Sequence, residues 1–145
     1  MLNMQHKEIL GFVGEYAFLS NFWPCQIEFE GLTFPSVEHA YVAAKSFDLV
    51  IRRKVQQLKY PGQVKKFGRS FTLRCDWEDV KLPIMYELVY QKFSKNENLK
   101  EKLLQTGNSY LEETNSWKDI YWGVYNGIGQ NLLGNNLMEV REKLK

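Results

Sequence analysis

The sequence of 145 residues lacks the features that mark membrane, disulfide-rich and duplex-binding proteins. Its longest apolar stretches fall far short of the roughly 20 residues that a membrane helix needs. Two cysteines cannot form a disulfide framework, and a formal net charge of +2 excludes the strong basicity of proteins that wrap a nucleic-acid duplex. The first residues do not show the charged, apolar and small-residue pattern of a targeting leader, so we expect none. We therefore expect a cytoplasmic protein with no membrane association.

Motifs for metal binding and for nucleophilic catalysis are also absent. The two histidines, His6 and His39, and the two cysteines, Cys25 and Cys75, show none of the spacings of metal ligands. The sequence has no G-x-S-x-G elbow, and neither cysteine has a candidate base nearby in the sequence. We expect no metal and no cofactor, which leaves acid chemistry carried out by side chains alone.

A hydrophobic content of 44% with only 4 prolines is sufficient for one core in a chain of this length. We therefore expect a single domain over residues 1–145, with residues 1–7 frayed. Helical and strand-like segments interleave without βαβ units, which predicts a compact α-rich α+β domain with several helices and a small antiparallel sheet or hairpin. The strands are expected at residues 8–13, 110–113 and 120–122, with a hairpin at 27–34. The helices are expected at residues 37–47, 49–58, 61–67, 77–92, 99–104 and 130–144.

The first long helical segment carries an acid and a lysine. Ser36 suits the N-cap, and a turn of 100° per residue places Glu38 and Lys45 at the edge of one apolar face. The helical rise separates them by roughly 10 Å, too far for a simple ion pair, yet both can reach one cleft. An exposed Glu and Lys beside a packed face is the alternative interpretation. His39 points away from the apolar stripe, so we expect a surface or capping role for it.

A second polar and aromatic cluster lies between residues 117 and 131. Trp117 and Trp122 flank Asp119 and would offer flat faces for a nucleobase beside one carboxylate. A glycine pair ending at Gly129, just before a helix, lets backbone N–H groups approach an anion. The glycine motif is weak, because it lacks the Lys and Ser/Thr of a P-loop and the third glycine of a dinucleotide site. Aromatic residues beside a turn most often belong to a core.

Seven sequence blocks together resemble the NADAR, or YbiA-like, family, over residues 14–144. The blocks are FLSNFWP from residue 18, PSVEHAYVAAKSF from 35, RCDW from 74, KFSKN from 92, LLQTG from 103, LEETNSWKDIYWG from 111 and GIGQNLLGNNLMEVR from 127. The resemblance implies a single YbiA-like domain with N-glycosidase activity on a ribosyl C–N bond, without a metal. Trp23 and Leu132 depart from the common pattern, which leaves the chemistry intact and bears on substrate choice.

The resemblance also implies which residues form the site. The catalytic candidates are Glu38, Asp119 and Lys45. The substrate-binding candidates that it supplies are Asn21, Phe22, Trp77 and Asn131. Chemistry adds Trp122 as a second wall for the base, and Arg52 or backbone amides near Gly129, with Lys45, to neutralise phosphate.

Cleavage of a ribosyl C–N bond passes through an oxocarbenium-like state, so positive charge grows on the sugar and negative charge on the departing nitrogen. Glu38 or Asp119 would stabilise the cation and orient water, while the other, or Lys45, would assist the leaving group. The sequence leaves open which carboxylate has which role.

The expected partner is a nucleotide-like small molecule or an ADP-ribosylated nucleic acid. We favour ADP-ribosylated guanine, with riboflavin-pathway ribosyl-pyrimidine intermediates as the other possibility, because basic residues could form a rim around the cleft. These residues are Arg52, Arg53, Lys54, Lys59, Lys65, Lys66 and Arg69. A solvated helix face is the alternative explanation for most of them.

The rival function is a non-catalytic ADP-ribose-binding or nucleotide-binding module. Paired acids in one pocket would argue against it, because a module that only binds phosphate gains nothing from extra negative charge near its ligand.

Overall fold

Residues 7–145 are described by the computed structural model, in which the chain divides into two units. One unit comprises residues 7–20 with residues 93–145, and the other comprises residues 21–92. The prediction that residues 1–7 are frayed falls mostly outside the described residues. Only Lys7 is described, and its carbonyl oxygen accepts a hydrogen bond from the Tyr110 amide at 3.0 Å. One domain over the whole chain stays a prediction.

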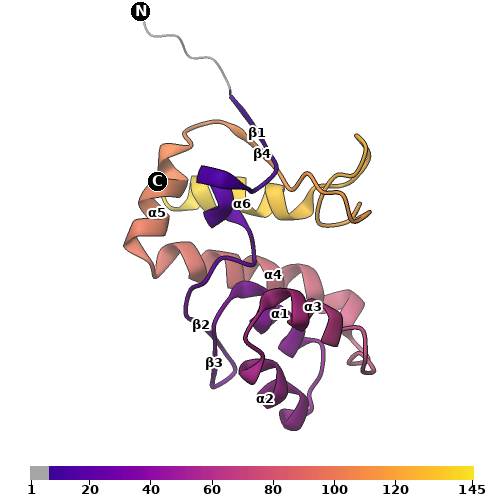
Figure 1. The fold of residues 1–145 in the computed structure, drawn as a ribbon. Helices are drawn as coiled ribbons and strands as arrows, with labels where there is room; N and C mark the ends of the chain where they lie inside the picture. The colour runs from indigo at the N-terminus through magenta and orange to yellow at the C-terminus, as the bar shows by residue number, and fades with distance from the viewer. Residues whose placement is uncertain (1–6) are drawn as a thin grey trace, which may run out of the picture. The chain divides into compact units, whose positions relative to one another are not determined.

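Helices and short strands make up both units, which confirms the α-rich α+β class (Figure 1). The strands are β1 (Glu8–Leu10), β2 (Ile27–Phe29), β3 (Leu32–Phe34) and β4 (Tyr110–Glu112). The helices are the 3₁₀ helix η1 (Gly14–Leu19), α1 (Val37–Ala44), α2 (Leu49–Gln57), α3 (Pro61–Phe67), α4 (Trp77–Ser94), α5 (Glu97–Gln105) and α6 (Leu132–Lys143).

The predicted hairpin is confirmed as the antiparallel pair β2–β3, in which Ile27 lies opposite Phe34. The two residues of its turn, Glu30 and Gly31, have φ values of 46° and 86°. Positive φ at both central residues is what a tight hairpin turn requires, and glycine adopts it without a steric penalty. The alternating polarity of residues 27–34 and their Glu-Gly turn were therefore sufficient to locate this hairpin.

The helix α1 is buried on nearly all sides, against α2, α3 and the hairpin. It begins as predicted after Ser36, whose hydroxyl accepts a hydrogen bond from the His39 amide at 3.1 Å. It ends at Ala44, shorter than the predicted 37–47. The end of α3 packs closely on α1: a Cβ added at Gly68, the C-cap of α3, would lie 3.1 Å from a methyl carbon of Val42.

His39 is buried, with 1% of its surface exposed, so the expected surface position is wrong. Its Nδ1 lies 2.7 Å from Ser36 Oγ and its Nε2 lies 2.8 Å from the carbonyl oxygen of Leu58. These two partners satisfy both ring nitrogens, which is why a polar ring can replace an apolar one inside the core. Burial lowers the pKa of His39 below its ordinary value, against the opposing effect of the Leu58 carbonyl.

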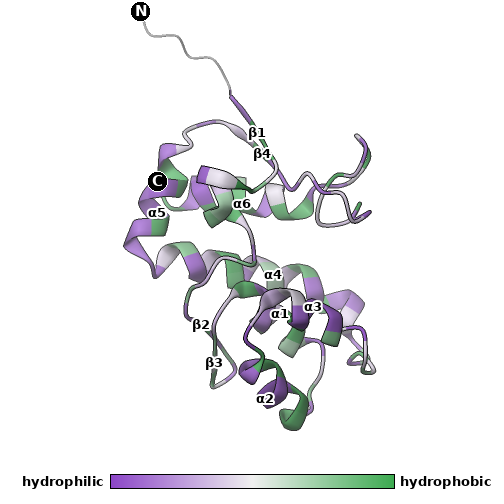
Figure 2. Cartoon of the chain, in the orientation of Figure 1, coloured by the Kyte–Doolittle hydropathy of each residue, from purple (hydrophilic) through white to green (hydrophobic). Residues whose placement is uncertain are grey.

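The other unit contains the parallel pair β1–β4, in which Ile9 lies opposite Leu111. Both strands are shorter than predicted. They pair in parallel, whereas the sequence had predicted only an antiparallel sheet or hairpin. The helix α6 packs against β4 through buried apolar residues that include Leu137 and Val140. Figure 2 shows apolar and polar segments on both α5 and α6, as expected for amphipathic helices.

The burial of His39 predicts a pH dependence of stability. Because its pKa is lower in the folded than in the unfolded chain, the unfolded state takes up the extra proton, and the free energy of unfolding should fall as the pH drops through the ordinary histidine value of 6.5. Urea unfolding between about pH 8 and about pH 5 measures this change. His39→Asn should be less stable at neutral pH and show a smaller loss on acidification. Parallel pH curves for the two proteins would contradict the prediction.

Candidate active site

The predicted site residues fall into both units, and each set is described separately. One unit holds Asn21, Phe22, Glu38, Lys45, Arg52 and Trp77, and the other holds Asp119, Trp122, Gly129 and Asn131. We call Glu38, Tyr41, Lys45 and Trp77 the acid–lysine cluster. Residues 113–131 are called the Asp119 loop.

The two charged residues of the acid–lysine cluster lie at the ends of α1, with Glu38 in its first turn and Lys45 at its C-cap. The Glu38 amide donates to the carbonyl oxygen of Asn21 at 3.1 Å, and the Arg74 amide donates to the carbonyl oxygen of Lys45 at 2.7 Å. These bonds join two other sequence blocks, FLSNFWP and RCDW, to the ends of the helix. Glu38 and Lys45 are both half-buried. The backbone on either side of each is therefore fixed before any substrate arrives.

Aromatic rings lie next to the lysine. The ammonium of Lys45 lies 5.4 Å from the centroid of the Tyr41 ring, within range of a cation–π contact. That ring lies 5.1 Å from the Trp77 ring, at an interplanar angle of 55°. Trp77 itself is only 4% exposed. Tyr41 was not among the predicted site residues, and its spacing of four residues from Lys45 was the signal that could have identified this contact.

Electrostatics link the acid to the lysine. Burial lowers the pKa of the Lys45 ammonium below its ordinary value, Glu38 acts in the opposite direction, and the cations Arg69, Lys65 and Lys81 lower it further. The two residues are thus within each other's field, although the sequence placed them too far apart for a simple ion pair. A lysine whose pKa is lowered gives up its proton more readily, which suits a proton donor to a leaving group.

Two other predicted residues lie just before this helix in the sequence. Asn21 is 8% exposed, and its side-chain amide lies 3.5 Å from the sulfur of Met85. Phe22 is 42% exposed. The adjacent pair therefore combines a buried anchor with an aromatic ring that a ligand could reach.

Arg52 has a structural environment that its position in the sequence did not indicate. Its guanidinium is buried, with Nη1 2.6 Å from a carboxylate oxygen of Glu30 and Nε 2.8 Å from the carbonyl oxygen of Ser46. It also lies 5.1 Å from the ring of Phe29. These contacts attach the hairpin to the start of α2. Phosphate neutralisation by Arg52 stays a prediction, and it would have to compete with the bond to Glu30.

Asp119 shapes its own loop. Its Oδ1 accepts hydrogen bonds from the amides of Tyr121 and Trp122, at 3.0 and 2.9 Å. These two amides are consequently unavailable for a strand ladder, which is why the predicted strand at 120–122 is wrong. The rings of Tyr121 and Trp122 meet edge to face, with centroids 4.8 Å apart. The acid and the aromatic pair thus form one local unit.

Four consecutive amides at the start of α6 and just before it donate within the same loop. The amides of residues 130, 131, 132 and 133 donate to the carbonyl oxygens of residues 120, 123, 121 and 122, at 2.8 to 3.2 Å. The helix start therefore finds its partners in the protein. The expected approach of an anion to backbone amides near Gly129 has no support from this geometry. A substrate contact at Gly129 stays a prediction.

Close backbone packing explains two of the loop glycines. A Cβ at Gly129, where φ is 153°, would overlap the carbonyl oxygen of Gly123, and a Cβ at Gly123 would overlap that of Glu113. Both positions therefore exclude a side chain for reasons of packing. Asn131 is buried beside them, accepting from the Glu113 amide at 3.0 Å and donating to the Leu111 carbonyl at 2.9 Å.

Asn115 is a residue that the sequence analysis missed. Its side-chain oxygen accepts from the Asp119 amide at 3.0 Å, and its Nδ2 lies 2.9 Å from the Asp119 carbonyl and 3.2 Å from those of Glu113 and Val124. One amide thus holds both backbone groups of Asp119. An Asn four residues before an Asp, in a stretch rich in turn formers, was the available signal.

Two further observations concern the described part of the chain. Among residues 7–145, no group of three or more His, Cys, Asp or Glu side chains is arranged to hold a metal ion. Within the same range, none of the helices has both the length and the apolar character needed to cross a bilayer.

Comparisons with known proteins show the family and the fold of the chain. The NADAR domain model matches residues 7–145. A riboflavin biosynthesis protein of Vibrio vulnificus is 39% identical over 133 residues, which cover 90% of this chain and 36% of that protein. The N-glycosidase YbiA of Shigella boydii is 37% identical over 133 residues, which cover 90% of this chain and 82% of the enzyme. The NMR structure of Escherichia coli YbiA aligns with a TM-score of 0.84 at 34% identity, covering 97% of this chain and 87% of that one.

The chain therefore belongs to the NADAR domain family, as the sequence blocks implied. Its α-rich fold is that of the YbiA structure. The predicted enzyme class, N-glycosidase, is confirmed by the relatives of that name.

The bonds of Asn115 predict that Asn115→Ala destabilises the protein by about 2 kcal/mol, because several partly buried backbone groups lose their partner. Urea unfolding monitored by circular dichroism measures the difference. Asn135→Ala is the matched control, since Asn135 is exposed and makes one long contact of 3.4 Å; this change should shift stability by less than about 0.5 kcal/mol. Equal stabilities for the two variants would show that Asn115 does not hold the loop.

Proposed function

We propose that this protein hydrolyses a ribosyl C–N bond without a metal, with Glu38, Asp119 and Lys45 as its catalytic residues. The observation that carries the proposal is the half-buried pair Glu38 and Lys45, electrostatically coupled beside the rings of Tyr41 and Trp77. An acid within the electrostatic field of a potential proton donor suits glycosidic cleavage.

In the proposed reaction, the bond between the anomeric carbon and the base nitrogen breaks, and water adds its oxygen to that carbon. The carbon becomes cationic in the transition state, so a carboxylate beside the sugar lowers its energy. One water proton passes to a carboxylate, and the departing nitrogen receives a proton from the second acid or from Lys45. Either Glu38 or Asp119 could stabilise the cation. The lowered pKa of Lys45 supports its role as the donor.

The fixed orientation of the Asp119 carboxylate supports a catalytic role for this residue. Both backbone groups of Asp119 are held by Asn115, and Oδ1 is held by the amides of Tyr121 and Trp122. Within residues 7–145, Oδ2 has no hydrogen-bond partner. A carboxylate restrained in this way needs little reorganisation when charge develops on a substrate.

For the substrate, we favour ADP-ribosylated guanine. Arg69, Lys65 and Lys81 act on Lys45 electrostatically, although Lys81 is itself paired with Glu78, and we infer that this group of cations suits a diphosphate. The second candidate is a ribosyl-pyrimidine intermediate of riboflavin synthesis. It is supported by the name of the Vibrio vulnificus relative.

Replacement of Glu38 tests the proposal directly. Glu38→Gln keeps the shape of the side chain and removes its charge, and we expect kcat to fall by roughly a hundredfold to ten-thousandfold. The assay incubates purified protein with ADP-ribosylated guanine DNA, and separately with the aminated ribosyl-pyrimidine, and measures the freed base by chromatography. Glu87→Gln, at an exposed position of α4, is the matched control and should keep full activity. A folded Glu38→Gln protein that releases base at the parental rate would refute the role of Glu38.

Asp119→Asn separates chemistry from loop structure. The amide oxygen of Asn can still accept from the two backbone amides, so the unfolding midpoint should change little, while loss of the charge should lower kcat at least tenfold. Asp79→Asn, an exposed position in the first turn of α4, provides the control. Unchanged kcat with unchanged stability would remove Asp119 from the mechanism and leave Glu38 with Lys45.

A further inference from the structure

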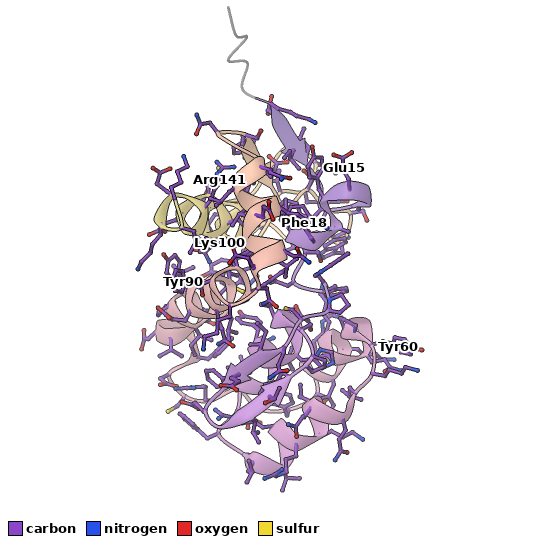
Figure 3. All side chains as sticks on the ribbon, turned by 90° about the vertical axis from the view of Figure 1, so that its left-hand side faces the viewer. Glu15, Phe18, Tyr60, Tyr90, Lys100 and Arg141 are labelled. Atoms are coloured by element: carbon purple, nitrogen blue, oxygen red, sulfur yellow. The ribbon has the colours of Figure 1, made fainter. Side chains whose placement is uncertain are left out.

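A cavity of about 490 Å³ lies in the unit formed by residues 7–20 and 93–145, within the size range of small-molecule sites. It is bounded by β1, η1, the end of α5 and the turn that follows α5. Its buried lining includes Ile9, Phe18 and Ser109, which are 3, 4 and 8% exposed. Figure 3 shows Phe18 beside α5. None of the proposed catalytic residues lines this cavity.

Two ammonium groups lie over aromatic rings of the lining. Lys7 Nζ lies 5.3 Å from the centroid of the Tyr16 ring and donates to its hydroxyl at 2.9 Å. Lys102 Nζ lies 5.7 Å from the centroid of the Phe18 ring. Both lysines line the cavity. The Tyr16 hydroxyl and the Phe18 ring therefore hold these two ammonium groups at the wall of the cavity.

A third cation lies behind one wall. Arg141, which is 6% exposed, donates from Nη1 to the hydroxyl of Thr106 at 2.9 Å, and Thr106 lines the cavity. Arg141 forms no ion pair within the described range 7–145. Burial lowers the pKa of this guanidinium, a sign that its charge is incompletely solvated. The C-terminal end of α5 offsets part of that charge through the helix dipole.

One carboxylate, Glu15, opposes these cations at the cavity. Lys7 and Lys102 on the lining, with Arg141 behind it, outnumber this acid, so the region has a net positive charge. The apolar floor of Ile9 and Phe18 favours a flat, apolar body, and the hydroxyl of Ser109 can supply hydrogen bonds. These features together select for a ligand that is apolar at one end and anionic at the other.

We propose that this cavity binds a small aromatic anion, an aryl phosphate or carboxylate, with the ring against Phe18 and the anionic group at Lys102 and Lys7. This is a second ligand site, and it does not depend on the glycosidase proposal. The shared chemistry is a planar apolar body carrying one anionic group. Phosphate and carboxylate ligands are distinguished by the probes used in the test.

The test follows backbone amide signals of the ¹⁵N-labelled full chain by NMR during titration with phenyl phosphate, benzoate, inorganic phosphate and benzyl alcohol. Saturable shifts of the Phe18, Thr106 and Ser109 amides are expected with phenyl phosphate or benzoate. Inorganic phosphate and benzyl alcohol, which each lack one half of the ligand, should bind these residues at least tenfold more weakly. Equal binding of inorganic phosphate, or shifts confined to the amides around Lys45, would overturn the proposal.

Lys102→Gln should weaken the binding of the aromatic anion about tenfold, which corresponds to about 1.4 kcal/mol. Lys100→Gln is the matched control, because Lys100 lies on the same helix, does not line the cavity and should leave the affinity unchanged (Figure 3). Glu15→Gln should tighten binding by removing the opposing charge. Identical affinities in the Lys102 and Lys100 variants would refute the assigned anion position. Both lysines are on the surface of α5, and circular dichroism verifies folding.

Discussion

The burial of α1 is the constraint on which the acid–lysine cluster depends. Every residue of this helix is buried except Glu38, which is half-buried. Lys45, the residue that follows the helix, is also half-buried. A helix held by its neighbours on almost all sides has little freedom to rotate, so the direction of these two side chains follows from the packing of the whole unit. The small residues of α1 contribute, because they allow α2, α3 and the hairpin to approach it closely.

Asp119 is held in place by different means. No regular secondary structure surrounds it, and side-chain amides and backbone amides supply the restraint instead. Asn115 holds the backbone of Asp119. Asn131 joins the end of the loop to Glu113 and Leu111, and the Asp119 carboxylate binds the amides of Tyr121 and Trp122. Polar networks of this kind specify one conformation only when every member is satisfied. The loss of one amide should therefore affect the loop as a whole.

Much of the fold could be predicted from local patterns. The hairpin and α3 followed from alternating polarity, a Glu-Gly turn and an early proline, and Ser36 marked the start of α1. The Asp119 loop could not be predicted in this way, because periodicity carries no information about side chains that bond to the backbone. Arg52 illustrates the same limit: as part of a basic stretch it suggested a phosphate contact, whereas Glu30, a distant residue in the sequence, is its partner.

The two modes of restraint have a chemical consequence. An oxocarbenium-like transition state is stabilised by charges that are already in position, because reorganisation during the reaction would consume the benefit. In the proposed mechanism, helix packing would hold Glu38 in position and hydrogen bonds would hold Asp119. The field around Lys45 adds a further element: burial and three neighbouring cations favour its neutral form, whereas Glu38 favours the ammonium. An anionic substrate bound near these cations would favour the ammonium, in the same direction as Glu38.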